Sequence, residues 1–473
     1  MKSLFKIFCS IMSSVFLFTL MMPVSYASDW NRSWKKHLDE GKGVSVAPGN
    51  DDTEVYITWY GGKDGVAPVV KVSTKKDMSD AKAFEGSIHS NEKIERANHV
   101  TVTGLEKGKT YYYVCSDGTT DTKVESFKTV AENSAFSAVY VSDIHISGES
   151  YEDAYLEATA REFDNVLNEA TSKADISLIL SGGDQATEGR PCEYFAMVAP
   201  DELRKIPTSI AVGNHDVKRY TFSALANYPN LKTDNKSESL ICSDYYFVKG
   251  NALFLVIDST NSSAADHYEF VRDAVEANPD VMWRVMMFHH DLYGGHIESR
   301  EAENKLLKLL FTPIIDEFQI DICLMGHSHC YSQSHIIYSR VISEEITKNA
   351  KITDPKGTVY FSSGTLTPDE AEKSGEPIVF DSDYKSEFIA TDCLAHDESI
   401  YSILDFTEKT LTVKSYIKGN KEAFNSLEIT KTSQQGGHPE EKAPMWFSVG
   451  KYLGTIYNWI NNISRNGEIK ERG

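Results

Sequence analysis

Five short clusters of polar side chains each follow closely on an apolar stretch of the chain. The clusters are Asp143-Ile144-His145, Gly182-Gly183-Asp184, Gly213-Asn214-His215-Asp216, His289-His290 and Gly326-His327-Ser328-His329. In open α/β sheets, ligands bind in the crevice beyond the carboxyl ends of the strands. If each apolar stretch is a strand, all five clusters reach that edge and their side chains converge on one site.

The residue types in these clusters are those of metal ligands. Imidazole and carboxylate groups suit first-row ions such as Zn, Mn or Fe, and an amide oxygen can join them. There are enough of these groups for two ions, and Asp184, in the middle of the set, could bridge both. Paired ions about 3.5–4 Å apart catalyse displacement at phosphorus by activating a hydroxide and offsetting the charge of the substrate. The set therefore predicts a dinuclear site for a phosphate ester.

Taken singly, the clusters are weak evidence. Gly-Asp is common in turns, and His289-His290 would also suit the end of an ordinary strand. The third and fifth clusters are more specific, and in an extended segment His327 and His329 point to the same side, as chelation requires. The combination of all five predicts the site. The sequence has neither the G-x-S-x-G of a serine hydrolase nor a P-loop.

The region before the first cluster reads as all-β. From Val44 to about Val130, short β-branched and aromatic runs are separated by Gly, Asp, Asn and Ser, which is typical of a small β-sandwich. The predicted strands are Val55–Tyr60, Val69–Ser73, 99–102, 111–115 and 124–129.

From about Ala135, apolar strands alternate with helical segments such as Asp153–Lys173. This alternation predicts a layered α/β domain with helices flanking sheets. The predicted strands are Phe136–Val141, 176–180, 210–212, 245–248, 252–257, 285–288, Ile322–Met325, 359–361, 401–406 and Thr410–Ile417.

The two ends of the chain have their own character. Lys2 and Lys6, an uncharged apolar run over 7–24 and small residues at Ser25 and Ala27 predict a secretory signal peptide over 1–27, with a retained membrane anchor as the alternative. Residues 28–41 form a polar leader. In the tail, 433–473, apolar residues recur at three- and four-residue spacing, which predicts an amphipathic helix. That helix either docks on the catalytic domain or lies at an interface with a membrane or partner. We expect an extracytoplasmic protein without a membrane-spanning segment after cleavage.

The charge balance narrows the class of partner. The 473 residues include 48 Lys+Arg and 69 Asp+Glu, a formal net charge of −21. A nucleic-acid binder needs a basic footprint that displaces counterions, so we expect no nucleic-acid binding. An anionic substrate would need another source of attraction, which bound metal ions supply.

Together the clusters, in this order, resemble those of the calcineurin-like metallophosphoesterases and, more narrowly, of the purple acid phosphatases. The resemblance spans about residues 44–430. It includes Val102-Thr103-Gly104-Leu105, Gly108-Lys109-Thr110-Tyr111-Tyr112-Tyr113, Phe288-His289-His290-Asp291-Leu292-Tyr293 and Gly326-His327-Ser328-His329-Cys330-Tyr331. It implies a fibronectin-III-like β-sandwich over 42–131 followed by a layered α/β metallophosphoesterase domain over 135–432.

The resemblance also implies a role for each site residue. The first ion would be held by Asp143, His145, Asp184 and His329, and the second by Asp184, Asn214, His289 and His327. His289 is preferred to His290 because the family's ligand precedes a Tyr by four residues, here Tyr293. His215 would contact the phosphate or the leaving group, with Asp216 orienting it. His296 resembles the family's substrate-facing His and would protonate the leaving oxygen.

One position departs from the purple enzymes. Their metal-binding Tyr, three residues after the bridging Asp, is replaced here by Thr187, and His145 takes its place in the ligand set. The resemblance therefore implies a colourless enzyme in which a Zn or Mn pair is more plausible than an Fe(III)–tyrosinate centre, with Fe in one site still open.

The sequence supports a metal-dependent phosphatase that acts on phosphate monoesters. A phosphodiesterase with the same centre is the nearest alternative. The third hypothesis is a secreted binding or adhesion protein whose phosphatase domain is vestigial. The presence of the full ligand set argues against this hypothesis.

Overall fold

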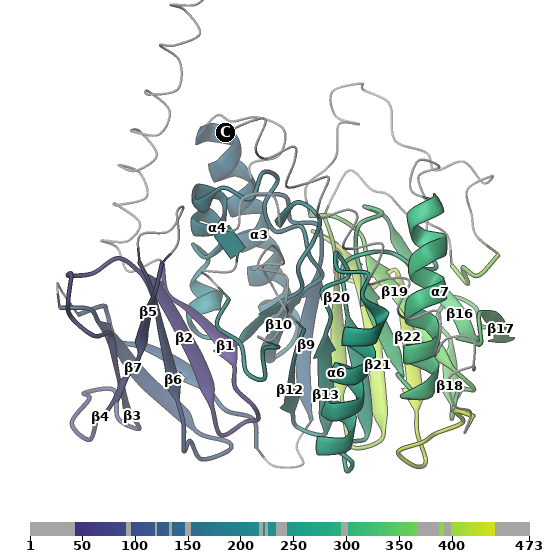
Figure 1. Cartoon of the computed structure of the whole chain (residues 1–473), viewed down its shortest axis with the longest axis horizontal. Coiled ribbons are helices and arrows are strands. Elements are labelled where there is room, and N and C mark those ends of the chain that lie inside the picture. Colours follow the sequence, from purple (N-terminus) through teal and green to yellow (C-terminus); the bar gives the residue numbers. More distant parts are fainter. Residues whose placement is uncertain are drawn as a thin grey trace, which may run out of the picture.

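The computed structural model describes residues 43–90, 96–118, 121–131, 135–146, 153–216, 221–222, 226–232, 244–294, 301–366, 387–391 and 399–439. The predicted signal peptide, the leader, His296 and the predicted tail helix lie outside these ranges. The elements fall into a β-sandwich, on the left in Figure 1, and a larger layered domain beside it.

The N-terminal sandwich consists of two antiparallel four-stranded sheets. One has the strand order β1 (Ser45–Pro48), β2 (Val55–Tyr60), β6 (Ala97–Val102) and β5 (Ser87–His89). The other has the order β4 (Lys82–Glu85), β3 (Val69–Ser73), β7 (Thr110–Ser116) and β8 (Glu125–Lys128). In β3, Val70 and Val72 are buried while Lys71 between them is exposed, so the period of two packs one face of each strand into the core.

The larger domain is built on two seven-stranded mixed sheets. The first has the order β11 (Thr208–Ile210), β10 (Ile176–Ser181), β9 (Phe136–Val141), β20 (Ile400–Phe406), β21 (Thr410–Ile417), β22 (Asn425–Thr430) and β18 (Lys351–Thr353). The second has the order β12 (Tyr245–Lys249), β13 (Ala252–Val256), β14 (Trp283–Met287), β15 (Ile322–Met325), β19 (Thr358–Ser363), β16 (Tyr331–Tyr338) and β17 (Val341–Glu344).

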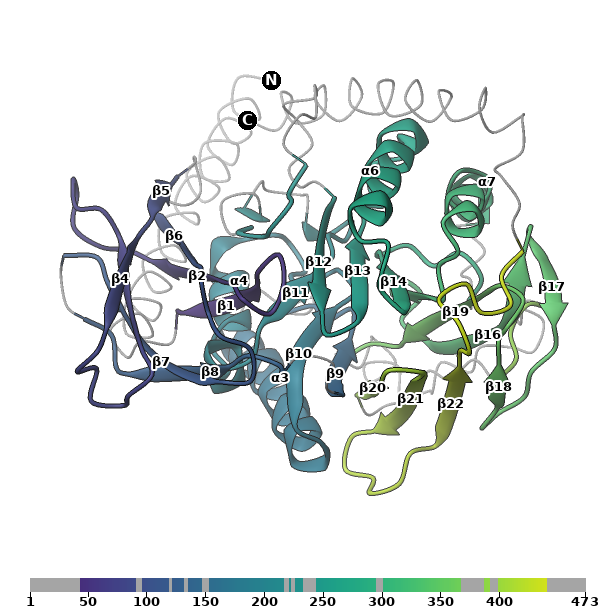
Figure 2. The same ribbon diagram turned by 90° about the horizontal axis from the view of Figure 1, so that it is seen from below.

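Helices cover the outer faces of both sheets. Figure 2 shows α3 (Asp153–Lys173) on one side and α6 (Ala264–Ala277) with α7 (Glu301–Glu317) on the other, with the sheets between them. Tyr140 and Phe254 belong to the apolar core between the sheets. The central strands are thus buried on both faces, which explains their continuous apolar sequences. The architecture confirms the predicted fold class.

Most of the predicted elements that position the site are confirmed, and β9, α3 and β15 have the predicted bounds. The strand predicted at 210–212 is wrong by two residues, because β11 ends at Ile210 and the buried Ala211 and Val212 continue the apolar run beyond it. The domain boundaries 42–131 and 135–432 stay predictions.

The sandwich is joined to the layered domain by buried contacts. Lys249, the last residue of β12, has its Nζ 3.2 Å from Oδ1 of Asp52, and the side chains are only 6% and 7% exposed. The amide of Gly250 donates to the other oxygen of Asp52 at 2.8 Å. Tyr60 packs its ring 4.8 Å from that of Phe195 on α4 (Pro191–Met197). The two parts therefore share an interior.

This junction predicts a large stability effect. Asp52→Ala leaves the Lys249 ammonium buried without its carboxylate, which costs about 3–5 kcal/mol. The matched control is Asp121→Ala, which breaks a pair with Lys71 whose side chains are 48% and 46% exposed and should cost less than about 1 kcal/mol. Urea unfolding of both variants measures the difference, and equal losses would contradict a buried ionic junction.

Candidate metal centre

The five polar clusters all follow strand ends on one side of the two sheets. Asp143 and His145 follow β9, and Asp184 follows β10, its parallel neighbour. His289 follows β14, and the His327–His329 turn follows β15, which is parallel to β14. Because parallel strands end at the same edge, each sheet delivers its ligands to one place.

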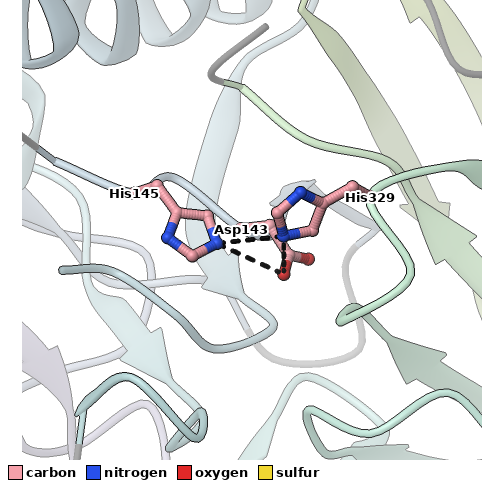
Figure 3. Close-up of side chains that lie close together, drawn as sticks. All are labelled: Asp143, His145 and His329. Carbon is pink, nitrogen blue, oxygen red and sulfur yellow. Dashed lines mark hydrogen bonds and ion pairs between the residues drawn. The ribbon is translucent and has the colours of Figure 1, made fainter. Parts of the chain in front are cut away.

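The first group of candidate ligands consists of Asp143, His145 and His329 (Figure 3). The Nε2 atoms of the two imidazoles are 3.0 Å apart. Oδ1 of Asp143 lies 3.4 Å from Nε2 of His329 and 4.0 Å from Nε2 of His145. Three ligand atoms from two sheets thus face a common point.

The second group of candidate ligands consists of Asp184, Asn214, His289 and His327. Nε2 of His289 is 3.1 Å from Oδ2 of Asp184, 3.0 Å from Oδ1 of Asn214 and 3.1 Å from Nδ1 of His327. The other ring nitrogen of His289 lies 3.1 Å from the carbonyl oxygen of Gly182. Since a carbonyl only accepts, Nδ1 carries a hydrogen and Nε2 is the nitrogen that can ligate.

Asp184 lies between these two groups of candidate ligands. The same oxygen, Oδ2, is 3.7 Å from Nε2 of His145 and 3.1 Å from Nε2 of His289. Its other oxygen accepts a hydrogen bond of 2.8 Å from the amide of His215, which fixes the carboxylate plane. The structure therefore places one buried carboxylate oxygen between the two groups of candidate ligands.

An unusual backbone aims these side chains. Five site residues have φ between 45° and 72°, in the left-handed region that residues with a Cβ adopt rarely: Asp143, His145, Asp184, His327 and His329. Such conformations persist only where the surroundings enforce them, and they concentrate at functional sites. Here the amide of His145 donates to the carbonyl of Asp184, and the amide of His327 donates to both carboxylate oxygens of Asp143.

The glycines of the motifs are required by space. A Cβ on Gly213 would collide with Oδ1 of Asp184, and one on Gly183 would collide with Nδ1 of His289. A Cβ on Gly326 would collide with Asp143 and with the Ser142 hydroxyl. Each glycine therefore lets one ligand loop approach another closely.

His215 and Asp216 have different surroundings. Nδ1 of His215 lies 2.6 Å from the carbonyl oxygen of Thr187, and the residue forms a third possible ligand group with His145 and Asp184. The carboxylate of Asp216 accepts from the amide of Gly213 at 2.8 Å and from the Tyr194 phenol at 2.7 Å. These contacts hold the loop rather than the ring of His215. The orienting role predicted for Asp216 stays a prediction.

Ser142 and Tyr194 also support the site, and no pattern in the sequence points to Tyr194. The Ser142 hydroxyl donates to Oδ2 of Asp143 at 2.7 Å. Ser142 could have been noticed because it directly precedes the aspartate, whereas Tyr194 lies on the separate helix α4.

The electrostatics of the two ligand groups favour the binding of cations. Burial opposes the ionisation of Asp143 and Asp184, but the facing imidazoles outweigh it and hold the pKa of each carboxyl below its ordinary value. Burial also opposes the charged form of His289, yet the charge of Asp184 raises the pKa of His289 to about 9. Burial and the neighbouring His329 lower the pKa of His145 to about 4. His145 is therefore neutral at pH 7, as a metal ligand must be.

The donor set fits two first-row metal ions. Imidazole nitrogens, carboxylate oxygens and one amide oxygen converge in two groups, close enough together within each group to share one ion.

Comparisons with known proteins agree with this geometry. Residues 136–331 match the model of the calcineurin-like phosphoesterase family, and residues 42–129 match that of the purple acid phosphatase N-terminal domain. The chain thus contains a calcineurin-like phosphoesterase domain preceded by a purple acid phosphatase N-terminal domain. The resemblance inferred from the motifs is confirmed, and this phosphoesterase is a hydrolase of phosphoric esters.

Among its relatives are two proteins of Arabidopsis thaliana. Purple acid phosphatase 15 is 21% identical over 382 residues, which cover 69% of this chain and 68% of the relative. Purple acid phosphatase 23 is 22% identical over 364 residues, which cover 68% of this chain and 73% of the relative.

Two solved structures share the fold. The purple acid phosphatase from yellow lupin (Lupinus luteus) seeds superposes with a TM-score of 0.64 at 15% identity, covering 82% of this chain and 74% of the other. PhoD superposes with a TM-score of 0.55 at 13% identity, covering 89% and 98%. Within the described ranges, every helix falls short of the length and apolar character that a membrane span requires.

Metal loading of this phosphoesterase should release protons. His289 holds a proton below about pH 9 in the metal-free protein, and an ion must displace it to bind Nε2. We therefore expect metal affinity to fall as the pH decreases below that value, by up to about tenfold per pH unit for this one proton. Calorimetric titration with Mn²⁺ at pH 7 in two buffers of different ionisation enthalpy measures the release. A binding enthalpy that is the same in both buffers would contradict it.

Proposed function

We propose that this protein is an exported phosphatase that hydrolyses phosphate monoesters at a dinuclear metal centre. The observation that carries the proposal is the position of Asp184, whose Oδ2 lies between one ligand group that contains His145 and another that contains His289. The names of the relatives, which are phosphatases, favour monoesters. A phosphodiesterase with the same centre is the second candidate.

The proposed ligands of each ion are one of the two groups of candidate ligands described above. Asp143, His145, Asp184 and His329 would hold the first ion, and Asp184, Asn214, His289 and His327 the second. When bound, the ions would polarise the phosphoryl oxygens and lower the pKa of the attacking water. Zn, Mn and Fe all suit these donors.

His215 is proposed to act on the substrate. Because the Thr187 carbonyl accepts from Nδ1 of His215, His215 would act on the phosphate or the leaving group through Nε2. His296, outside the described residues, is proposed to protonate the leaving oxygen.

The absence of a tyrosine at position 187 bears on the metals. Thr187 turns its carbonyl towards His215, and His145 lies against Asp184 where it can serve as the ligand instead. We therefore propose a centre without an Fe(III)–tyrosinate, and a colourless enzyme.

Export is proposed from the sequence of residues 1–27 alone, with its basic start, apolar run and small residues at Ser25 and Ala27.

Two substitutions test the division of roles. Asp184→Asn should abolish metal loading and activity together, because it weakens the proposed bridge. His215→Ala should lower turnover about 10²–10⁴-fold while both ions stay bound. Metal content and turnover are measured side by side. Asp175→Asn, which changes an acid whose side chain is 91% exposed, is the matched control. Full activity in Asp184→Asn would disprove the bridging assignment.

The substrate class is tested with one pair of compounds. The chain over 28–473, reloaded with Mn²⁺ or Zn²⁺, is assayed against an aryl phosphate monoester and the matching diester, with and without chelator. We expect faster turnover of the monoester, abolished by chelator, because bound ions would lower the pKa of the attacking water. Faster turnover of the diester would make the protein a phosphodiesterase, and turnover that resists chelator would overturn the metal mechanism.

A further inference from the structure

A histidine outside the proposed ligand set packs against two histidines within it. The ring of His290 is centred 4.6 Å from that of His327 and 5.4 Å from that of His289. All three side chains are buried. Both neighbours belong to the group around Asp184, so the His290 ring limits how two ligands of one ion can rotate.

Ser259 holds His290 at two atoms. The Ser259 hydroxyl oxygen lies 2.8 Å from Nδ1 of the His290 ring. It also accepts a hydrogen bond of 3.1 Å from the backbone amide of His290. A hydroxyl can donate once and accept twice, so it can satisfy both contacts. With the amide and the ring fixed to one oxygen, the His290 side chain has little freedom to turn.

The loop that carries Ser259 is itself anchored. It follows β13 at Asp258, whose Oδ1 accepts from the amide of Thr260 at 3.0 Å and from its hydroxyl at 2.6 Å. The amide of Asp258 donates to Oδ1 of Asp244 at 3.0 Å. These bonds close a tight turn around the serine.

A buried ion pair fixes the far side of this loop. Nδ1 of His267, on α6, lies 2.6 Å from Oδ2 of Asp244, and its Nε2 lies 2.7 Å from the carbonyl oxygen of Asn261. An ionised carboxylate and a carbonyl only accept, so both ring nitrogens donate and His267 is cationic. The His267 and Asp244 side chains are 1% and 3% exposed, so the loop is held by a charge-assisted bond inside the domain.

We propose that Ser259 and His290 are positioning residues, which hold His289 and His327 in the arrangement that the second metal ion requires. The inference rests on the proposed dinuclear centre. It assigns no contact with substrate to either residue, since both act through the rings of the ligands.

The first test is metal binding by the full chain. Metal-free wild type and Ser259→Ala are titrated with Mn²⁺, and Co²⁺-loaded samples give the visible spectrum. We expect Ser259→Ala to bind one ion about 10–100-fold more weakly, and the other within about twofold of wild type, with an altered Co²⁺ spectrum. His290→Asn, which removes the ring packed on His327, should show the same selective loss.

Two further variants serve as controls. Ser259→Thr keeps the hydroxyl and should restore most of the lost affinity. Thr358→Val removes another buried hydroxyl, which donates to the carbonyl of Ile320 at 2.6 Å at the opposite end of the second sheet, and should bind both ions like wild type. If Ser259→Ala does not fold, His290→Asn and Ser259→Thr decide the question.

The outcomes separate this inference from the proposed function. Ser259→Ala and His290→Asn that titrate like Thr358→Val, with an unchanged Co²⁺ spectrum, would overturn the positioning role while the dinuclear centre stands. Wild type that binds fewer than two ions would instead overturn the centre itself. An equal loss at both ions would also overturn the inference, because it would show a general loosening of the site rather than support of one ion.

Discussion

The burial of carboxylates and imidazoles side by side is the constraint on which the rest of the structure depends. Asp143 and Asp184 are carboxylates at 0% and 2% exposure, and they face imidazoles rather than lysines or arginines. Without a cation, two buried negative charges must be offset by protons, as the raised pKa of His289 shows. The interior is therefore arranged for positive charge, and the protons of the metal-free protein occupy places that metal ions can take.

Bringing these atoms together strains the backbone, and the surrounding sheets maintain the strain. Left-handed residues alternate with ordinary ones in the turns after β9 and β15. This lets Asp143 and His145 point to the same side within three residues (Figure 3), and it brings His327 and His329 to neighbouring groups of candidate ligands. The strands before these turns are almost entirely buried, so packing on both faces holds them in place. Precision at the site thus comes from rigid elements on both sides of each turn.

The sequence predicted what depends on long apolar runs, and missed what depends on single side chains. Buried strands such as β9 and β15 have continuous apolar sequences, so the polar residues after them stand out. The exposed edge strand β17 has no such run and was not predicted. The support of His290 by Ser259 was also missed, because the partners are 31 residues apart and a serine in a polar loop has no signature. The Tyr194 contact with Asp216 escaped for the same reason.

The shared interior of the two domains also matters while the chain is being made. The sandwich is complete at Lys128, but Phe195 and Lys249, which cover Tyr60 and neutralise Asp52, are synthesised later. Until then the Tyr60 ring and the Asp52 carboxylate of the finished sandwich are exposed to water, whereas the complete protein buries both. A truncated chain keeps that face exposed, so chaperones and proteases that bind exposed apolar surface can distinguish an unfinished molecule from a finished one.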